Sequence, residues 1–259
     1  MSDLSQVKTI PLKSKLSPAE WATRVDLAAC YRLVHHYRMD DLVYNHISAR
    51  VPGEDEHFLI NAYGMTYDEI TASSLVKIDL NGNVVQDSGT GYGVNHAGFV
   101  IHSAVHRARH DVACVIHTHT PAGMAVSAME CGLLPLTQNA MFFSGVGLHE
   151  YEGPAVDLDE QQRLVADLGQ HDAMILRNHG LLAVGRTIPE AFITMYWLER
   201  ACQAQALAVS SNQKLKVPEK ATIKLTNDRY KPGQRRRIGE LEWGGLLRLL
   251  ERRYPGFRD

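Results

Sequence analysis

The stretch Val115-Ile116-His117-Thr118-His119-Thr120-Pro121 decides both the expected fold and the expected kind of site. The apolar run from Val112 to Ile116 predicts a buried strand, and two histidines follow at its end. In an extended chain, residues two apart share a face, with Cα atoms about 6.6 Å apart. Two such imidazoles can converge on one metal ion, at Zn–N distances of about 2.0–2.1 Å. By itself, this stretch favours a pair of structural histidines that form hydrogen bonds.

A second strand end offers a third histidine. Met174-Ile175-Leu176 is apolar, and Arg177-Asn178-His179-Gly180 follows it directly. We expect Gly180 to adopt a positive φ, which would turn the chain and aim the His179 ring along the same edge of the sheet. Three histidines leave coordination positions open, as in catalytic rather than structural zinc sites. The sequence therefore predicts that the three histidines bind one divalent metal, with zinc as the expected ion.

Helices and strands are mixed around these two strands. Ser17-Pro18-Ala19-Glu20 and Thr187-Ile188-Pro189-Glu190 are capping boxes, and they predict helices that end near residues 38 and 210. Asn95 and Asp157 are expected to cap helices that end near residues 109 and 168. Runs at 43–51, 58–62, 75–80 and 84–85 are typical of strands joined by turns. This mixture predicts an α/β fold, with three layers in the order α/β/α around a central mixed sheet.

The chain divides into three parts on its sequence pattern. Residues 1–16 are polar and aperiodic, which predicts an N-terminal arm, and residues 17–210 form one expected domain. Residues 211–259 form a C-terminal extension, in which 211–232 is polar and is expected to be irregular. The stretch from Trp243 to Leu250 predicts an amphipathic helix that packs on the domain or on a neighbouring subunit.

Composition excludes several classes of partner. The 259 residues are 45% hydrophobic and 22% charged, and the formal net charge of −2 favours neither nucleic acid nor an anionic membrane as a partner. The first 15 residues lack the apolar core of a signal peptide or a membrane span. The four cysteines form no C-x-x-C pair, so neither a disulfide framework nor a cysteine zinc site is expected. These features favour a cytoplasmic protein.

Two motifs carry a resemblance to a known family. Ile116-His117-Thr118-His119-Thr120 and Arg177-Asn178-His179-Gly180-Leu181 resemble the class II aldolase/adducin family, whose zinc ligands match these histidines. Asn45-His46-Ile47-Ser48-Ala49-Arg50 and Cys131-Gly132-Leu133-Leu134-Pro135 resemble the adducin head within that family. The resemblance extends over nearly all of residues 21–210. It implies a three-layer fold around a mixed sheet, a homotetramer, and a metal site near the subunit boundary.

The chain departs from the sugar-phosphate aldolases of this family at the substrate site. Those enzymes carry a Gly-Asn-x-Ser loop, a Thr-Pro-x-Gly loop and a Ser-Ser-Glu triplet, which hold the phosphate and supply a proton-transferring glutamate. Here His46 replaces the phosphate-binding asparagine, and Tyr63, followed by Gly64, brings a ring into the second loop. Gly98 stands where the glutamate belongs. We therefore expect His46, Tyr63 and Gly64 to line a pocket for an unphosphorylated substrate.

Proton transfer then needs a replacement for the missing glutamate. Histidine has a suitable unperturbed pKa, about 6.5, for general acid–base work. His96 and Tyr67 are the residues we expect to be catalytic. The other titratable candidates nearby in the alignment are His46, His102 and Tyr63.

Two functions of different class remain open. The first is a metal-dependent lyase acting on a small carbonyl compound, either an unphosphorylated hydroxy-carbonyl compound or an oxo-acid, in which the metal stabilises an enediolate. The second is a non-catalytic assembly module like adducin, with a vestigial metal site. The retained histidines favour the enzyme, as does a chain that ends at Asp259 without adducin's long basic tail. Gly98 favours the module.

Overall fold

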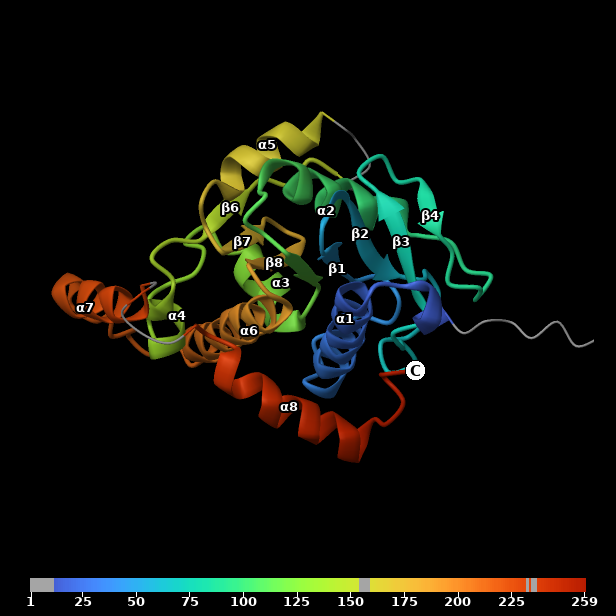
Figure 1. Cartoon of the computed structure of the whole chain (residues 1–259). Coiled ribbons are helices and arrows are strands. Elements are labelled where there is room, and N and C mark those ends of the chain that lie inside the picture. Colours follow the sequence, from blue (N-terminus) through green and yellow to red (C-terminus); the bar gives the residue numbers. More distant parts are fainter. Residues whose placement is uncertain (1–11, 154–158, 232, 234–236) are drawn as a thin grey trace, which may run out of the picture.

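The central feature of the computed structural model is a single sheet of eight strands (Figure 1). The structure describes residues 12–153, 159–231, 233 and 237–259, without the side chains of residues 96 and 97. The strands are β1 (His46–Val51), β2 (Glu54–Asn61), β3 (Leu75–Asp79), β4 (Val84–Gln86), β5 (Cys114–Thr118), β6 (Gly147–His149), β7 (Ala173–Leu176) and β8 (Gly180–Gly185). Their order across the sheet is β4-β3-β2-β1-β5-β8-β7-β6, and only β6 and β7 are parallel neighbours. The mixed sheet confirms the α/β prediction.

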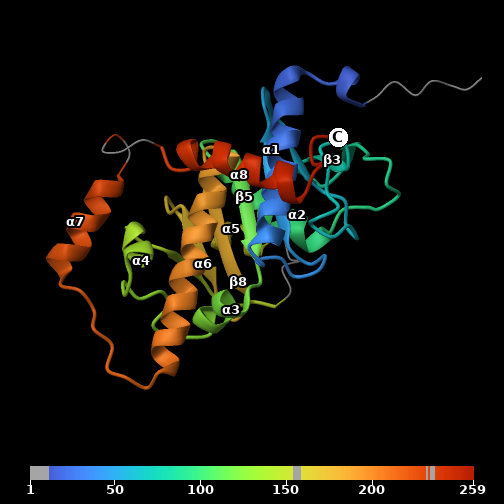
Figure 2. The same ribbon diagram turned by 90° about the horizontal axis from the view of Figure 1, so that it is seen from below.

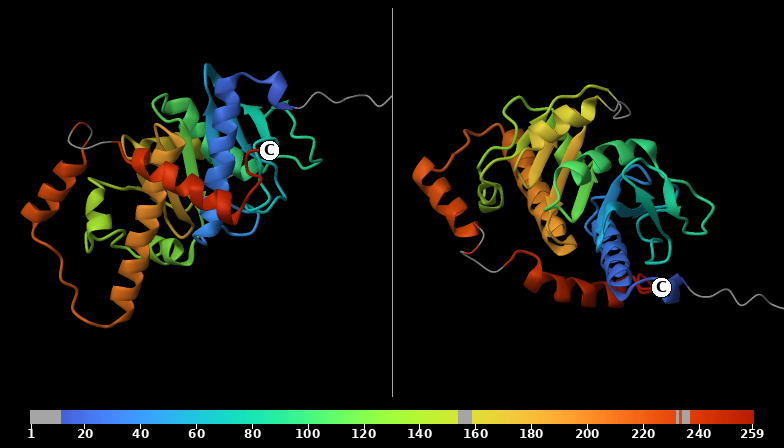
Figure 3. Two further views of the ribbon diagram at one scale, coloured as in Figure 1. Left: turned by 60° about the horizontal axis from the view of Figure 1, so that its bottom comes forward. Right: turned by 45° about the horizontal axis from the view of Figure 1, so that its top comes forward.

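Helices cover both faces of the sheet, so the fold has three layers (Figure 3). The helices are η1 (Leu12–Lys15, a 3-10 turn), α1 (Pro18–His36), α2 (His96–Ala108), α3 (Pro121–Ser127), α4 (Gln138–Phe142), α5 (Glu160–Leu168), α6 (Ile188–Ser210), α7 (Lys220–Tyr230) and α8 (Glu240–Arg253). One face carries α1, α3 and α6, and the other carries α2 and α5. α8 crosses the outer side of α1 and α6 (Figure 2).

The capping boxes begin helices where the sequence predicts them. The Ser17 hydroxyl accepts a hydrogen bond from the Glu20 amide at 3.1 Å, and Thr187 does the same for Glu190 at 3.2 Å. These bonds satisfy amides that the first turn of a helix leaves without a partner. Thr120 caps α3 in the same way and fixes the chain just beyond β5.

β5 lies between two of the hydrophobic cores, which explains why the histidines emerge at its end. Cys114 and Ile116 lie in the core under α1 and α6, whereas Val115 lies in the core under α2 and α5. The alternation continues to His117, which belongs on the α2 side. Every residue of β5 is buried, so the chain reaches polar surroundings only where the strand ends.

The C-terminal segment packs on the domain of the same chain. Leu250 and Phe257 are buried in the core under α1 and α6. The Trp243 indole donates to Asp26 of α1 at 3.0 Å, and the Arg32 guanidinium donates to the carbonyl of Pro255 at 2.8 Å. These contacts connect α8 to the long helix that begins the domain.

The structure corrects one expectation in this region. Residues 211–232 were expected to be irregular, but Lys220–Tyr230 form α7, which has no buried residue. Its sequence lacks an apolar stripe, so helical periodicity gave no signal. Tyr230 anchors the helix, because its ring lies 5.2 Å from that of Phe142 and 5.7 Å from that of Trp197, between centroids.

Other parts of the sequence prediction are incomplete or lie beyond the described residues. The short elements α4 and β6 were not expected. Asp157 and residues 1–11 lie outside the described residues, so the cap and most of the N-terminal arm stay predictions. Among the described helices, none has the length and apolar character to cross a membrane.

Candidate metal centre

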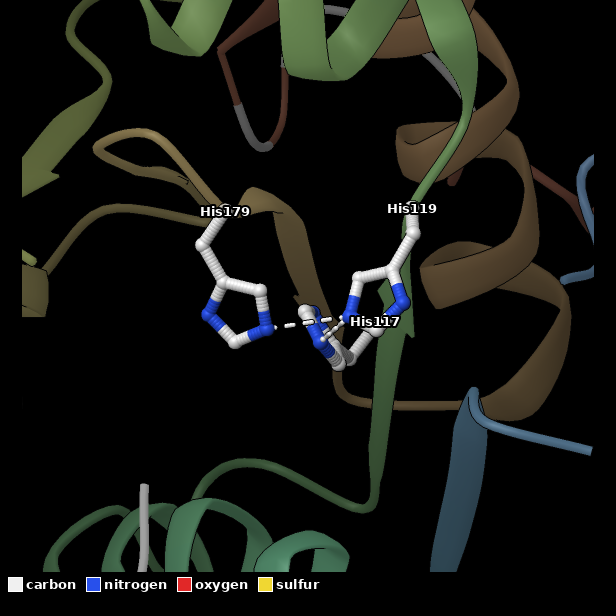
Figure 4. Close-up of side chains that lie close together, drawn as sticks. All are labelled: His117, His119 and His179. Atoms are coloured by element: carbon white, nitrogen blue, oxygen red, sulfur yellow. Dashed lines mark hydrogen bonds between the residues drawn. The ribbon is translucent and has the colours of Figure 1, made fainter. Parts of the chain in front are cut away.

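Three imidazoles from two strand ends meet at one point (Figure 4). His119 Nε2 lies 2.8 Å from His117 Nε2 and 3.0 Å from His179 Nε2. All three ligand atoms lie within 4.8 Å of one another, and His117 is buried while the other two are partly exposed. Zn–N bonds of about 2.0–2.1 Å with tetrahedral angles require nitrogens about 3.3 Å apart. The three nitrogens therefore lie close enough together to hold one ion.

The sheet register brings the two strand ends together. β5 pairs with β8, with His117 opposite Leu182 and Thr118 opposite Leu181. Next to them, the turn between β7 and β8 carries His179. The turn follows Leu176, whose carbonyl accepts a hydrogen bond from the His179 amide at 3.1 Å.

The glycine after His179 serves a purpose different from the expected one. Gly180 does not adopt a positive φ, and the left-handed residue of the turn is Asn178, at φ 52°. A Cβ at Gly180 would collide with the carbonyl of Thr118 and lie 3.2 Å from Cδ2 of His119. Glycine is required here because β8 passes close to β5, and not because the chain must turn.

The hydrogen bonds of the second ring nitrogens fit a metal. His117 Nδ1 lies 2.9 Å from the Leu181 carbonyl, and His119 Nδ1 lies 3.2 Å from the carboxylate of Asp41. Both partners only accept hydrogen bonds, so each Nδ1 carries a hydrogen and, in the neutral ring, each Nε2 presents a lone pair. Two lone pairs 2.8 Å apart repel each other unless a cation lies between them. Second-nitrogen bonds of this kind are usual for histidine ligands.

The electrostatics of the site favour a metal ion over a proton. Burial lowers the pKa of His117 well below its usual range, and the neighbouring histidines lower it further. Burial, followed by the effects of His119 and His149, lowers the pKa of His179 to about 4. Because the rings of His117 and His179 are neutral near pH 7, their nitrogens are available to a divalent cation.

His46 occupies the space beside Gly98. A Cβ added at Gly98 would lie 2.5 Å from Cδ2 and 2.6 Å from Cγ of His46. The His46 ring is 4% exposed, and it stacks on the His117 ring with centroids 6.1 Å apart. Its Nε2 lies 2.8 Å from the side-chain amide of Asn95, and burial, then His119 and His179, lowers its pKa to about 3. The imidazole thus fills the place toward which a side chain at position 98 would extend.

Two further histidines lie behind His46 in the core. His102 and His106 of α2 are fully buried, and both contact the hydroxyl of Ser48, at 2.6 and 2.8 Å. Burial holds the pKa of both rings far below the usual value, at about 3 for His106. The rings of His46 and His102 meet edge to face, with centroids 5.8 Å apart. The contacts of these rings with Ser48 and His46 connect this face of α2 to the sheet beside the metal site.

The remaining candidate residues differ in their access to the site. Tyr67 is fully buried against Tyr31, and its hydroxyl has no hydrogen-bond partner among the described residues. Tyr63 is 37% exposed, and Gly64 is covered by the ring of Tyr92, whose Cδ1 would lie 3.0 Å from an added Cβ. His96 begins α2, but its side chain lies outside the described part of the structure. The catalytic roles of His96 and Tyr67 stay predictions.

Comparisons with known proteins place the chain in a family. The class II aldolase and adducin N-terminal domain matches residues 25–206, so the chain belongs to the class II aldolase/adducin family. An aldolase II superfamily protein from Pseudomonas syringae is 50% identical, with a TM-score of 0.91 over 95% of this chain and 99% of that one. The L-fuculose 1-phosphate aldolase from Glaciozyma antarctica PI12 is 29% identical, with a TM-score of 0.80 over 90% of each chain. Alpha-adducin of Mus musculus is 42% identical over 257 residues, which cover 91% of this chain and 35% of adducin.

Proposed function

We propose that the protein is a metal-dependent carbon–carbon lyase that acts on a small unphosphorylated hydroxy-carbonyl compound or oxo-acid. The observation that supports this most strongly is the convergence of the three Nε2 atoms of His117, His119 and His179. A divalent metal, expected to be zinc, would polarise the substrate carbonyl and stabilise enediolate charge as a Lewis acid. The three neutral ligands leave the charge of the ion available to an anionic substrate oxygen.

The chain's own residues define the rest of the site. Buried His117 would hold the metal from inside, whereas partly exposed His119 and His179 would leave one side open to substrate. The His46 ring occupies the space beside Gly98, where a carboxylate in the related aldolases would move the proton. We therefore expect another group, for which His96 and Tyr67 are candidates, to transfer the proton.

The comparison proteins leave two alternatives that an experiment must separate. The relative named L-fuculose 1-phosphate aldolase favours a phosphorylated sugar as substrate. The 42% identity with alpha-adducin favours a non-catalytic assembly module. His46 and Tyr63 argue against a phosphorylated substrate. They bring rings into the loops that would otherwise present small polar groups to a phosphate.

The test is a turnover assay of the zinc-loaded protein. Unphosphorylated oxo-acids and hydroxy-carbonyl compounds are compared with fuculose, rhamnulose and ribulose phosphates, with His119→Ala and a chelator as controls. We expect turnover of an unphosphorylated compound that both controls abolish. Faster turnover of a sugar phosphate would contradict the proposed substrate class, and a metal-loaded protein inert toward every compound would favour the assembly module.

A further inference from the structure

We propose that Asp41 is a positioning residue for the metal site, which holds the His119 ring so that its Nε2 faces the ion. This inference rests on the proposed metal site. Asp41 Oδ2 lies 3.2 Å from His119 Nδ1, and the opposite nitrogen of the same ring faces His117 and His179. A carboxylate accepts hydrogen bonds and donates none, so the contact selects the tautomer in which His119 Nε2 is the ligand.

The hydrogen-bond partner of His119 differs in kind from the partner of the metal ligand His117. His117 Nδ1 is held by a main-chain carbonyl, that of Leu181, at 2.9 Å. That bond is neutral and is fixed by the β5–β8 pairing. Asp41 instead supplies a negative charge from a loop outside the sheet, and a charged acceptor makes the stronger hydrogen bond. The carboxylate also offsets part of the charge of a divalent ion.

The loop between α1 and β1 holds Asp41 between two buried anchors. Met39 is 1% exposed in the core, and Asn45 is fully buried directly before β1. The Tyr44 amide donates to the Asp41 carbonyl at 2.9 Å and closes a turn. Inside this turn, Leu42 adopts a left-handed φ of 49° while its side chain is 68% exposed. Left-handed backbone is unfavourable for leucine and an exposed side chain gains little from burial, so the surrounding contacts must hold this conformation.

An ordinary surface ion pair is the competing interpretation. The Asp41 side chain is 43% exposed and that of His119 is 18% exposed. An exposed pair contributes little to stability and would have no effect on metal binding. A positioning role predicts a loss of metal affinity that exceeds any change in the metal-free fold. The neighbouring acid provides a matched control, because Asp40 pairs with His35 Nδ1 at 2.8 Å instead of with a metal ligand.

The experiment measures zinc affinity of the full chain. Chelator-stripped wild type, Asp41→Asn, Asp41→Ala and Asp40→Asn are titrated with Zn²⁺ against a chromophoric competitor. Urea unfolding of each metal-free protein checks the fold. We expect Asp41→Ala to weaken zinc binding by about 10–100-fold, which is typical for loss of an outer partner of a histidine ligand. Asp41→Asn should lose less, because its amide oxygen still accepts from Nδ1, and Asp40→Asn should stay within about twofold of wild type.

The outcomes separate this inference from the proposed function. Zinc affinity of folded Asp41→Ala and Asp41→Asn within about twofold of wild type would overturn the role of Asp41 and leave the metal site standing. An equal loss in Asp40→Asn would also overturn it, because the effect would then belong to the loop and not to the contact with His119. If the wild-type chain binds no zinc, the metal site fails, and the role of Asp41 fails with it.

Discussion

A single methyl group at position 98 should destabilise the protein, because the His46 ring already fills the space beside Gly98. In an unobstructed helix, glycine to alanine stabilises by about 0.8–1.0 kcal/mol. At Gly98 the new Cβ would lie 2.5 Å from Cδ2 of His46. The ring has little freedom to move aside, since His46 pairs with His117 across the sheet and contacts Asn95 at 2.8 Å. Overpacking costs about 1–3 kcal/mol. After the gain in helix propensity is subtracted, we expect Gly98→Ala to lower the free energy of unfolding by up to about 2 kcal/mol.

A double-mutant cycle measures this contact directly. Wild type, Gly98→Ala, His46→Ala and the double variant are unfolded in urea without metal. We expect the methyl group to destabilise the wild type but not the His46→Ala background, with a coupling energy of about 1–3 kcal/mol. The control is Gly244→Ala on α8, an exposed helical glycine whose added Cβ would meet nothing closer than 3.6 Å.

Two results would refute the reasoning. One is an increase in the free energy of unfolding of Gly98→Ala equal to that of the Gly244→Ala control. The other is a coupling energy near zero between positions 98 and 46. The same contact bears on attempts to restore a carboxylate at this position. A glutamate at 98 meets the same ring, so Gly98→Glu should bind metal normally only when His46 is also replaced by a smaller residue.

Two further predictions concern pH and assembly. Between pH 7 and 5.5 the free energy of unfolding of the metal-free protein should fall by about 1 kcal/mol for each of His46 and His106. In the unfolded chain these imidazoles have a pKa of about 6.5 and take up protons in this range, whereas in the folded protein each has a pKa of about 3 and stays neutral. Because the pKa is depressed in the folded state, this stability is present above about pH 6.5 and is lost as the pH falls. A urea midpoint independent of pH in this window would contradict the prediction. The family resemblance predicts a homotetramer with α8 near a neighbouring chain, and light scattering that reports a monomer at micromolar concentration would rule this out.

The parts of the fold that the sequence predicted share a strong local signal. The capping boxes at Ser17 and Thr187 mark the start of α1 and α6, because side chain and amide lie three residues apart. The apolar run into His117 marks a buried strand, and its polar residues must lie where the strand ends. In contrast, α7 has neither a cap bond from its N-cap residue nor a buried face. It is held by the ring contacts of Tyr230 and by the Asn227 side-chain amide, which donates to the carbonyls of Met141 and Phe143.

The parts of the site that escaped prediction depend on contacts distant in the sequence. The contact between His46 and Gly98 depends on how α2 packs over β1, and neither residue reveals it alone. Asp41 reaches His119 through a loop with a left-handed leucine, a conformation that the residue type does not suggest. Gly180 was predicted as important for the wrong physical reason, because strand packing and a positive φ both require glycine.

The central claim, a metal held by three histidines, is tested most directly by metal content. Protein loaded with zinc and freed of excess by gel filtration is measured by mass spectrometry, beside His117→Ala, His179→Ala and the exposed control His110→Ala. We predict about one ion per chain in wild type and control, and near-complete loss in the two ligand variants, because two histidines rarely retain zinc against buffer. Equal metal content in all four proteins, with the ligand variants folded, would contradict the assignment of the site.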